Sequence, residues 1–280
     1  MSQSALATAA FGLASAASWG AGDFSGGLAT RRADLYAVLL VSQTVGAVSL
    51  AVLAVARAEP GPSPSMLGWG SAAGLMGALG IAALYRALAI GRMGMAAPVT
   101  ALVAAALPVL FASFSEGLPS PMQFVGFGLG LSGVWLISRP EGATGRPEGL
   151  GLALLSGIGF GTFFICIGQV RAPAVFWPLT AAKGVSLLLV VAVARGAGRL
   201  RLPKGPLPPL AGVAGVLDAG GNAFFVFAEQ AGRLDVASIL ASLYPAATVF
   251  LAHLILGERV SRMQAVGIAA ALVAIPLIAG

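Results

Sequence analysis

The stretch Met122-Gln123-Phe124-Val125-Gly126 recurs, with one residue changed, as Met263-Gln264-Ala265-Val266-Gly267. The two stretches lie 141 residues apart in a chain of 280. The same shift overlays Gly91-Arg92 on Gly232-Arg233, and it aligns three pairs of small residues: Gly80 with Gly221, Gly20 with Gly161, and Ser15 with Ser156. The pattern predicts an internal repeat, with residues 1–140 as the first half and residues 141–280 as the second.

The composition places this repeat in a membrane. Hydrophobic residues make up 58% of the chain and charged residues only 9%, whereas soluble domains carry about 25% charged residues. A membrane helix needs roughly 20 apolar residues. The apolar runs predict ten helices near 5–28, 35–56, 67–88, 94–114, 121–138, 149–170, 174–194, 208–229, 235–256 and 262–279. The breaks after the third and the sixth are weak, so nine helices is the alternative. The remaining loops leave no room for a soluble catalytic domain.

Five helices in each half is an odd number, so the second half must run in the opposite orientation to the first. Inverted repeats are typical of secondary transporters, in which the two halves exchange conformations around a site near the middle of the membrane. We therefore expect an all-α integral membrane protein. Its ten transmembrane helices would form two inverted five-helix repeats around a central cavity, lined by the first, third, fourth, sixth, eighth and ninth helices.

The basic residues predict the topology. Alternate loops hold most of them: Arg31, Arg32, Arg92, Arg139, Arg146, Arg195, Arg199, Arg201, Lys204, Arg259 and Arg262, with Arg86 nearby. The other side has only Arg57, Arg171 and Arg233. Loops rich in Lys and Arg stay in the cytoplasm, so both termini are expected outside, in a bacterial plasma membrane. This placement indicates topology and not a nucleic-acid surface, although the net charge is +6.

The end of each half carries a similar phrase, Glu116-Gly117-Leu118-Pro119-Ser120-Pro121-Met122-Gln123 with Gly126, and Gly257-Glu258-Arg259-Val260-Ser261-Arg262-Met263-Gln264 with Gly267. The second resembles the Gly-Glu-Arg-x-(Ser/Thr)…Gln…Gly signature of the drug/metabolite transporter superfamily, in its ten-helix EamA-like branch. The first departs from it at Glu116-Gly117. The resemblance covers the whole chain, including Trp19-Gly20. It implies export of amino acids, other metabolites or drugs without a nucleotide, and it looks closest to exporters of aromatic amino acids and paraquat.

The phrases also have a structural interpretation. Ser120-x-x-Gln123 and Ser261-x-x-Gln264 both fit a capping box, in which the serine and glutamine side chains satisfy the first amides of a helix. Pro121 stands at the favoured first helical position. These residues are therefore expected to start helices and not to touch a substrate.

Charges inside the bilayer are costly and mark candidate sites. Asp218 falls near the middle of the eighth helix and Lys183 near the middle of the seventh, so they could form an ion pair. The pair is either structural or, with Asn222 one turn after Asp218, a site for an ammonium group or a coupling proton.

A second candidate group lies on the first and sixth helices. Trp19 and Asp23 share a helix face because they are four residues apart, and the repeat places Phe160 and Phe164 in the equivalent positions. The four would suit a partly apolar zwitterion, or they pack as ordinary helix contacts. Weaker candidates are Tyr85, Tyr244 and His253, the last as a titrating group. Pro245, Pro98 and Pro108 could open their helices, because proline frees the carbonyl four residues earlier.

Three classes of protein remain: a secondary exporter, a membrane enzyme acting on lipids, and a structural membrane protein. One His (His253), one Cys (Cys166) and few carboxylates leave little for an enzyme site, and they exclude a conventional Cys/His zinc centre. No phosphate-binding loop is present, so no cofactor, metal or catalytic residue is expected. We expect a small-molecule substrate and a lipid bilayer as partners, with an exporter of lipophilic cations as the alternative to amino-acid export. A monomer is compatible with the sequence.

Overall fold

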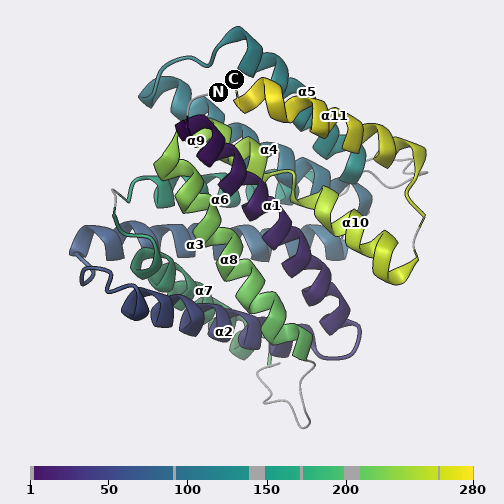
Figure 1. Cartoon of the computed structure of the whole chain (residues 1–280). Helices are drawn as coiled ribbons and strands as arrows, with labels where there is room; N and C mark the ends of the chain where they lie inside the picture. Colours follow the sequence, from purple (N-terminus) through teal and green to yellow (C-terminus); the bar gives the residue numbers. More distant parts are fainter. Residues whose placement is uncertain are drawn as a thin grey trace.

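The computed structural model describes residues 3–90, 93–138, 149–170, 173–198, 209–257 and 259–279, without the side chains at 84–86, 88–90, 93–98, 138 and 279. These residues form an all-helical bundle (Figure 1). The helices are α1 (Gln3–Thr30), α2 (Leu35–Ala56), α3 (Pro64–Ile90), α4 (Met93–Ser115), α5 (Pro121–Ser138), α6 (Leu150–Gly168), α7 (Phe176–Gly196), α8 (Pro209–Ala231), α9 (Leu234–Ala241), α10 (Tyr244–Leu256) and α11 (Arg262–Ala279).

The expected ninth helix, 235–256, is broken into α9 and α10, so the eleven helical segments of the described residues make ten spans. Pro245 has no amide hydrogen to donate to the carbonyl of Ala241, and the chain turns at Ser242 and Leu243. The Leu243 amide donates instead to Leu240 O at 3.2 Å. In contrast, α4 continues through Pro98 and Pro108, so neither proline interrupts that helix as Pro245 interrupts the ninth.

Both capping boxes are present as the sequence predicts. The Ser120 amide donates to Gln123 Oε1 at 3.0 Å, and the Gln123 amide donates to Ser120 Oγ at 3.2 Å. Ser261 and Gln264 repeat the arrangement at 2.9 and 3.2 Å. These hydrogen bonds satisfy amides at the starts of α5 and α11 that would otherwise lack a partner.

The two glutamines also join the halves in a reciprocal way. Gln123 Nε2 donates to Ile278 O at 3.3 Å, and Gln264 Nε2 donates to Ile137 O at 3.4 Å. The shift of 141 residues converts one contact into the other. The helices α5 and α11 therefore pack antiparallel, each binding the end of the other, as inverted repeats require (Figure 1).

The first helix of each half packs against the third helix of the other half: α1 against α8, and α6 against α3. Glycine makes both approaches possible. A Cβ at Gly221 would lie 2.3 Å from Trp19 Cδ1, and one at Gly80 would lie 3.1 Å from Phe160 Cδ1. Trp19 and Phe160 are equivalent under the shift of 141, as are Gly221 and Gly80. The repeat found in the sequence is thus a repeat of contacts.

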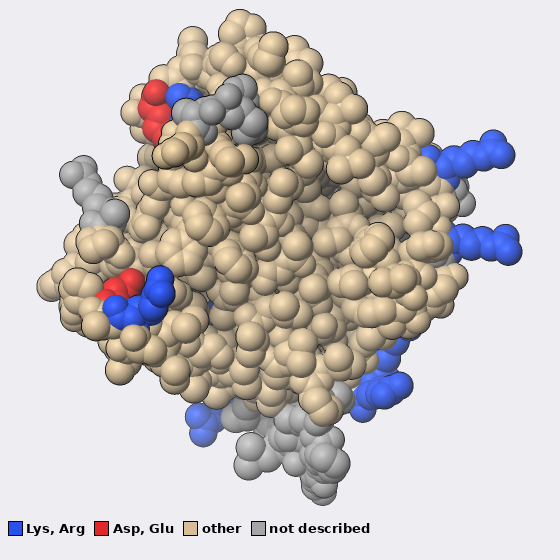
Figure 2. All heavy atoms as spheres, in the orientation of Figure 1, with Lys and Arg blue, Asp and Glu red and all other residues tan. Residues whose placement is uncertain are grey.

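Six helices or helix pairs within the described residues are long and apolar enough to cross a membrane, judged by length and composition: 35–56, 64–83, 150–168, 176–196, 209–231 and 234–256. Large apolar side chains such as Val55, Leu188, Leu254 and Leu272 are exposed on the outside of the bundle. In Figure 2 the Lys, Arg, Asp and Glu side chains lie near the rim of the view, and the broad area between them is uncharged. Lipid is the solvent that this surface fits.

The start of α1 and the end of α11 lie toward the same end of the bundle in Figure 1. We call this end of the bundle the terminal face; it holds the connections α2–α3, α4–α5, α6–α7 and α8–α9. The opposite face holds the connections α1–α2, α3–α4, α5–α6, α7–α8 and α10–α11.

The contact between Trp19 and Gly221 gives a test of this packing. Gly221→Ala would force Trp19 aside, because the added Cβ would lie within 2.3 Å of its ring. We expect a loss of about 1–3 kcal/mol in the free energy of unfolding, the usual cost of overpacking. Gly212→Ala in the same helix is the control, since a Cβ there meets nothing within 4 Å. Thermal unfolding in detergent measures both, and equal melting temperatures for the two variants would contradict the packing described.

Candidate functional site

The predicted ion pair is present in the interior of the second half. Lys183 Nζ, on α7, contacts Asp218 Oδ2, on α8. The Lys183 side chain is 11% exposed and that of Asp218 is 41% exposed. Asn222, one turn further along α8, donates from Nδ2 to Asp218 O at 2.6 Å and to Asp218 Oδ1 at 3.4 Å. Lys183 and Asn222 thus both contact Asp218, and part of the Asp218 side chain remains exposed.

Asp23 lies beside this pair. A Cβ at Gly22 would lie 3.4 Å from the Asp218 amide nitrogen, so α1 passes close to α8 at this point. The Asp23 side chain is exposed, and it is near enough to Asp218 for the two carboxylates to repel each other. The formal charges of the two carboxylates and the one ammonium sum to −1. In a membrane interior such a charge favours a bound cation.

Aromatic rings border the acidic pair. Trp19, on α1, stacks on Phe164 of α6 at 5.6 Å between ring centroids and on Phe225 of α8 at 6.0 Å. Phe164 and Phe225 stack at 4.6 Å, and both are buried. Trp19 is partly exposed and lies one turn before Asp23 on the same helix. An apolar surface therefore adjoins the carboxylates.

Tyr244 closes the group from the second half. It is the first residue of α10, directly after the break that Pro245 causes. Gly20 allows its backbone to approach, since a Cβ there would lie 2.4 Å from Tyr244 O, and Thr248 Oγ1 donates to Gly20 O at 3.1 Å. The Tyr244 hydroxyl is near enough to Asp23 to interact with its charge.

Most of the residues singled out in the sequence therefore come together: Trp19, Asp23, Phe164, Lys183, Asp218, Asn222 and Tyr244. Phe160 packs over Gly80 on α3 instead. His253 is exposed on α10. The side chain of Tyr85 lies outside the described residues. Phe225 was missed, although it follows Asp218 and Asn222 at helical spacing on one face of α8.

A cavity of about 430 Å³ opens between the start of α3 and the end of α6, on the terminal face. It is lined by Ser63, Ser65, Met66, Trp69, Gln169 and Val170. It lies at a contact between the two halves, since α3 belongs to the first and α6 to the second. The central cavity expected from the sequence stays a prediction.

The fold and the buried charges define a multi-pass membrane protein built from an inverted repeat. The family model of the EamA-like transporter family matches the chain twice, over residues 6–139 and 147–280. The chain belongs to this family, whose members are membrane transporters of small molecules. Among solved structures, one crystal structure superposes with a TM-score of 0.75 at 19% identity, covering 96% of this chain and 95% of the other. That likeness shows the fold. No individually curated protein matches.

The unequal exposure of the ion pair predicts unequal costs of breaking it. Asp218→Asn leaves an ammonium with 11% exposure, whereas Lys183→Met leaves a carboxylate with 41% exposure. Removing one partner of a fully buried pair costs about 3–5 kcal/mol. We expect Asp218→Asn to approach this loss and Lys183→Met to cost less. The double variant should recover part of the loss, because no unpaired charge remains. The melting temperatures of the wild type, the two single variants and the double variant form a double-mutant cycle. Strictly additive effects of the two substitutions would contradict the pairing.

Proposed function

We propose that this chain is a secondary transporter that exports amino acids, including aromatic ones, or similar small metabolites across the plasma membrane by alternating access. The observation that carries the proposal is the acidic pair Asp23 and Asp218. Both side chains have exposed surface, and they adjoin Trp19 in an otherwise apolar bundle. A structural ion pair alone would not need the second, unbalanced carboxylate.

The chemistry of an amino acid fits this group. Its ammonium would neutralise Asp23, which has the excess negative charge. Its carboxylate would interact with the ammonium of Lys183 and the hydroxyl of Tyr244. An aromatic side chain would stack on Trp19, at an energy of about 0.5–1.5 kcal/mol beyond its buried area. All three parts of the substrate would then have partners on α1, α7 and α10, and substrate binding would join the two halves.

The reciprocal contacts of the halves support alternating access. The packing of α1 on α8 is equivalent to that of α6 on α3, so an inverted copy of the present arrangement is available to the same chain. The excess of Lys and Arg in the loops of the opposite face supports a cytoplasmic location for that face. The termini would then lie outside, and transport toward the terminal face would be export.

A second candidate is an exporter of lipophilic cations. The net negative charge of Asp23, Asp218 and Lys183 favours it, and so does the partly exposed ring of Trp19, because aromatic faces attract cations. This function would need no partner for a substrate carboxylate.

Counterflow in proteoliposomes tests the proposal. Vesicles loaded with unlabelled amino acids are given labelled phenylalanine and threonine outside. We expect wild-type protein to accumulate label. We expect Asp23→Asn and Asp218→Asn to lower accumulation at least tenfold, an effect of about 1.4 kcal/mol or more. The first removes the partner of the substrate ammonium, and the second removes the partner that positions Lys183. Asp34→Asn is the matched control, since Asp34 is an exposed carboxylate that caps α2.

Normal accumulation by both acidic-pair variants would remove these carboxylates from the substrate site. No accumulation by well-folded wild-type protein would contradict amino-acid transport. A labelled quaternary amine in a parallel counterflow assay separates the two candidates: accumulation of the amine without accumulation of the amino acids would favour the exporter of lipophilic cations.

A further inference from the structure

The helices that begin on the terminal face are capped in two different ways. In the first half the caps are local: Ser63 Oγ accepts the Met66 amide of α3 at 3.3 Å, and the capping box of Ser120 starts α5. In the second half, the residues that precede α7 and α9, Val175 and Arg233, supply no side-chain cap of their own. Both of these helices receive a glutamate from the first half.

Glu59, in the α2–α3 connection, caps α7. Its carboxylate accepts hydrogen bonds from the amides of Val175, Phe176 and Trp177; the distances from the Phe176 and Trp177 nitrogens are 3.0 and 2.8 Å. A negative charge is stabilised at a helix N-terminus by the helix dipole and by these amides. Glu59 is therefore a charged link between the two halves.

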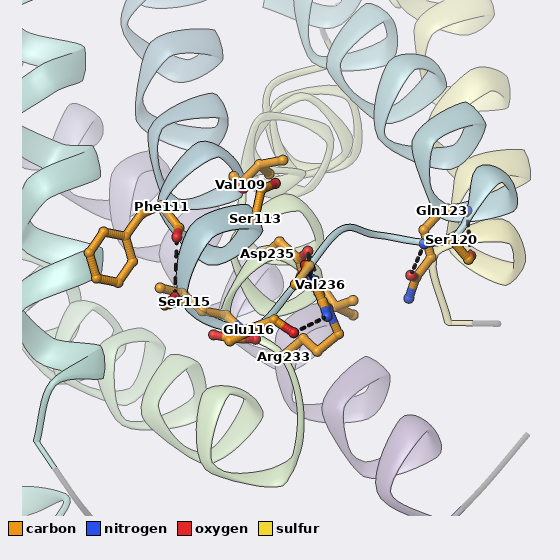
Figure 3. A network of polar contacts seen from close by, with 12 residues as sticks. Val109, Phe111, Ser113, Ser115, Glu116, Ser120, Gln123, Arg233, Asp235 and Val236 are labelled. Carbon is orange, nitrogen blue, oxygen red and sulfur yellow. Dashed lines mark hydrogen bonds and ion pairs between the residues drawn. The ribbon is translucent and has the colours of Figure 1, made fainter.

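Arg233, just before α9, makes the second link (Figure 3). Its guanidinium binds Asp235 through Nη2 at 2.7 Å and Nε at 3.0 Å. The same group donates to Glu116 O at 3.2 Å and Gly117 O at 2.7 Å in the α4–α5 connection of the first half. Asp235 is fully buried and holds the planar guanidinium in place.

The carboxylate of Glu116 is the weaker part of this link. It accepts the Leu234 amide at 3.3–3.4 Å. Desolvation raises the pKa of Glu116; the Leu234 amide and Arg233 lower it, and Asp235 raises it. Placing the charge here therefore costs energy, whereas the hydrogen bond with Asp235 raises the pKa of Arg233. Arg233 and Glu59 are the residues on which the links depend.

The repeat shows that these links break the symmetry of the protein. Under the shift of 141 residues, Glu59 corresponds to Leu200, Glu116 to Gly257 and Asp235 to Gly94. These three equivalent positions thus hold no carboxylate; Glu258, one residue after Gly257, lies outside the described residues. The glutamine contacts of α5 and α11, in contrast, occur on both faces.

We infer that Glu59 and the Arg233–Asp235 pair are two latches that hold the terminal face closed between the halves and bias the resting protein toward opening on the opposite face. The inference rests on the proposed function, because it assumes that the two faces open alternately. Opening the terminal face would uncap α7 and α9 and release Arg233 from Glu116 O and Gly117 O. Opening the opposite face breaks no such contact among the described residues. An exporter that rests open to the cytoplasm has the bias that these latches supply.

Spin-label distances across the terminal face test the latches. Labels are attached to Leu118→Cys in the first half and Pro173→Cys in the second, both exposed positions. Buried Cys166 is replaced by Ala. In lipid nanodiscs, double electron–electron resonance should give one short distance between the two labels when Glu59 and Arg233 are intact. We expect Glu59→Ala and Arg233→Ala to add a population at longer distance, and the two together to make it dominant.

The controls separate a latch from an ordinary helix cap. Asp34→Ala removes a cap from α2 on the opposite face, and Arg262→Ala removes an exposed arginine there. Neither should alter the distance, even if the melting temperature falls. A lowered melting temperature without a distance change in the latch variants would overturn the inference, because the links would then be structural caps only. Arg233→Lys, which keeps the charge but loses the planar donor group, should give an intermediate distribution.

The readout does not depend on the substrate. If the wild-type protein shows no counterflow but the latch variants show the longer distance, the proposed amino-acid transport is overturned and the latches are retained. If the wild-type protein shows normal counterflow but the distance is unchanged in both latch variants, the latches are overturned and the proposed transport is retained.

Discussion

The close approach of α1 to α8 is the constraint on which the rest of the structure depends. Gly221 lets the ring of Trp19 lie against α8, and the backbone of α1 at Gly22 passes close to the Asp218 amide, which brings Asp23 near Asp218. Ser15 and Ser18 hold the approach by donating to the carbonyls of Gly221 and Leu217 at 2.8 and 2.6 Å. Because α1 and α8 belong to different halves, any movement between the halves changes the surroundings of both carboxylates. The charged groups thus lie at the interface between the two halves.

The halves are similar in contacts but not in chemistry. Gly80 and Phe160 reproduce the packing of Gly221 and Trp19, yet the position equivalent to Asp23 holds Phe164, and that equivalent to Asp218 holds Gly77. The charges therefore gather on one side of the pseudo-symmetric bundle, while the aromatic residues come from both halves. Under the proposed function, such a repeat would retain the exchange of conformations and concentrate the substrate-binding groups at one place.

Much of the fold can be predicted from the sequence, because each membrane helix requires a long run of apolar residues. The repeat, the capping boxes of Ser120 and Ser261, and the pairing of Lys183 with Asp218 were all predicted and are confirmed. The break before Tyr244 was only partly foreseen, since Pro98 and Pro108 carry the same signal without breaking α4. The contacts of Glu59 and Arg233 could not be predicted, because each joins residues more than 110 positions apart with no motif to mark them.

The central claim is that Asp23 faces water within the bundle and not lipid. Asp23→Cys, in a chain whose Cys166 is replaced by Ala, tests it with a cationic, membrane-impermeant thiol reagent. Val52→Cys is the comparison, because Val52 is 59% exposed on the apolar outside of α2. The account predicts rapid modification at position 23 and little at position 52. If position 23 in the folded protein is as unreactive as position 52, the carboxylate does not line a water-filled path, and the proposed substrate site is wrong.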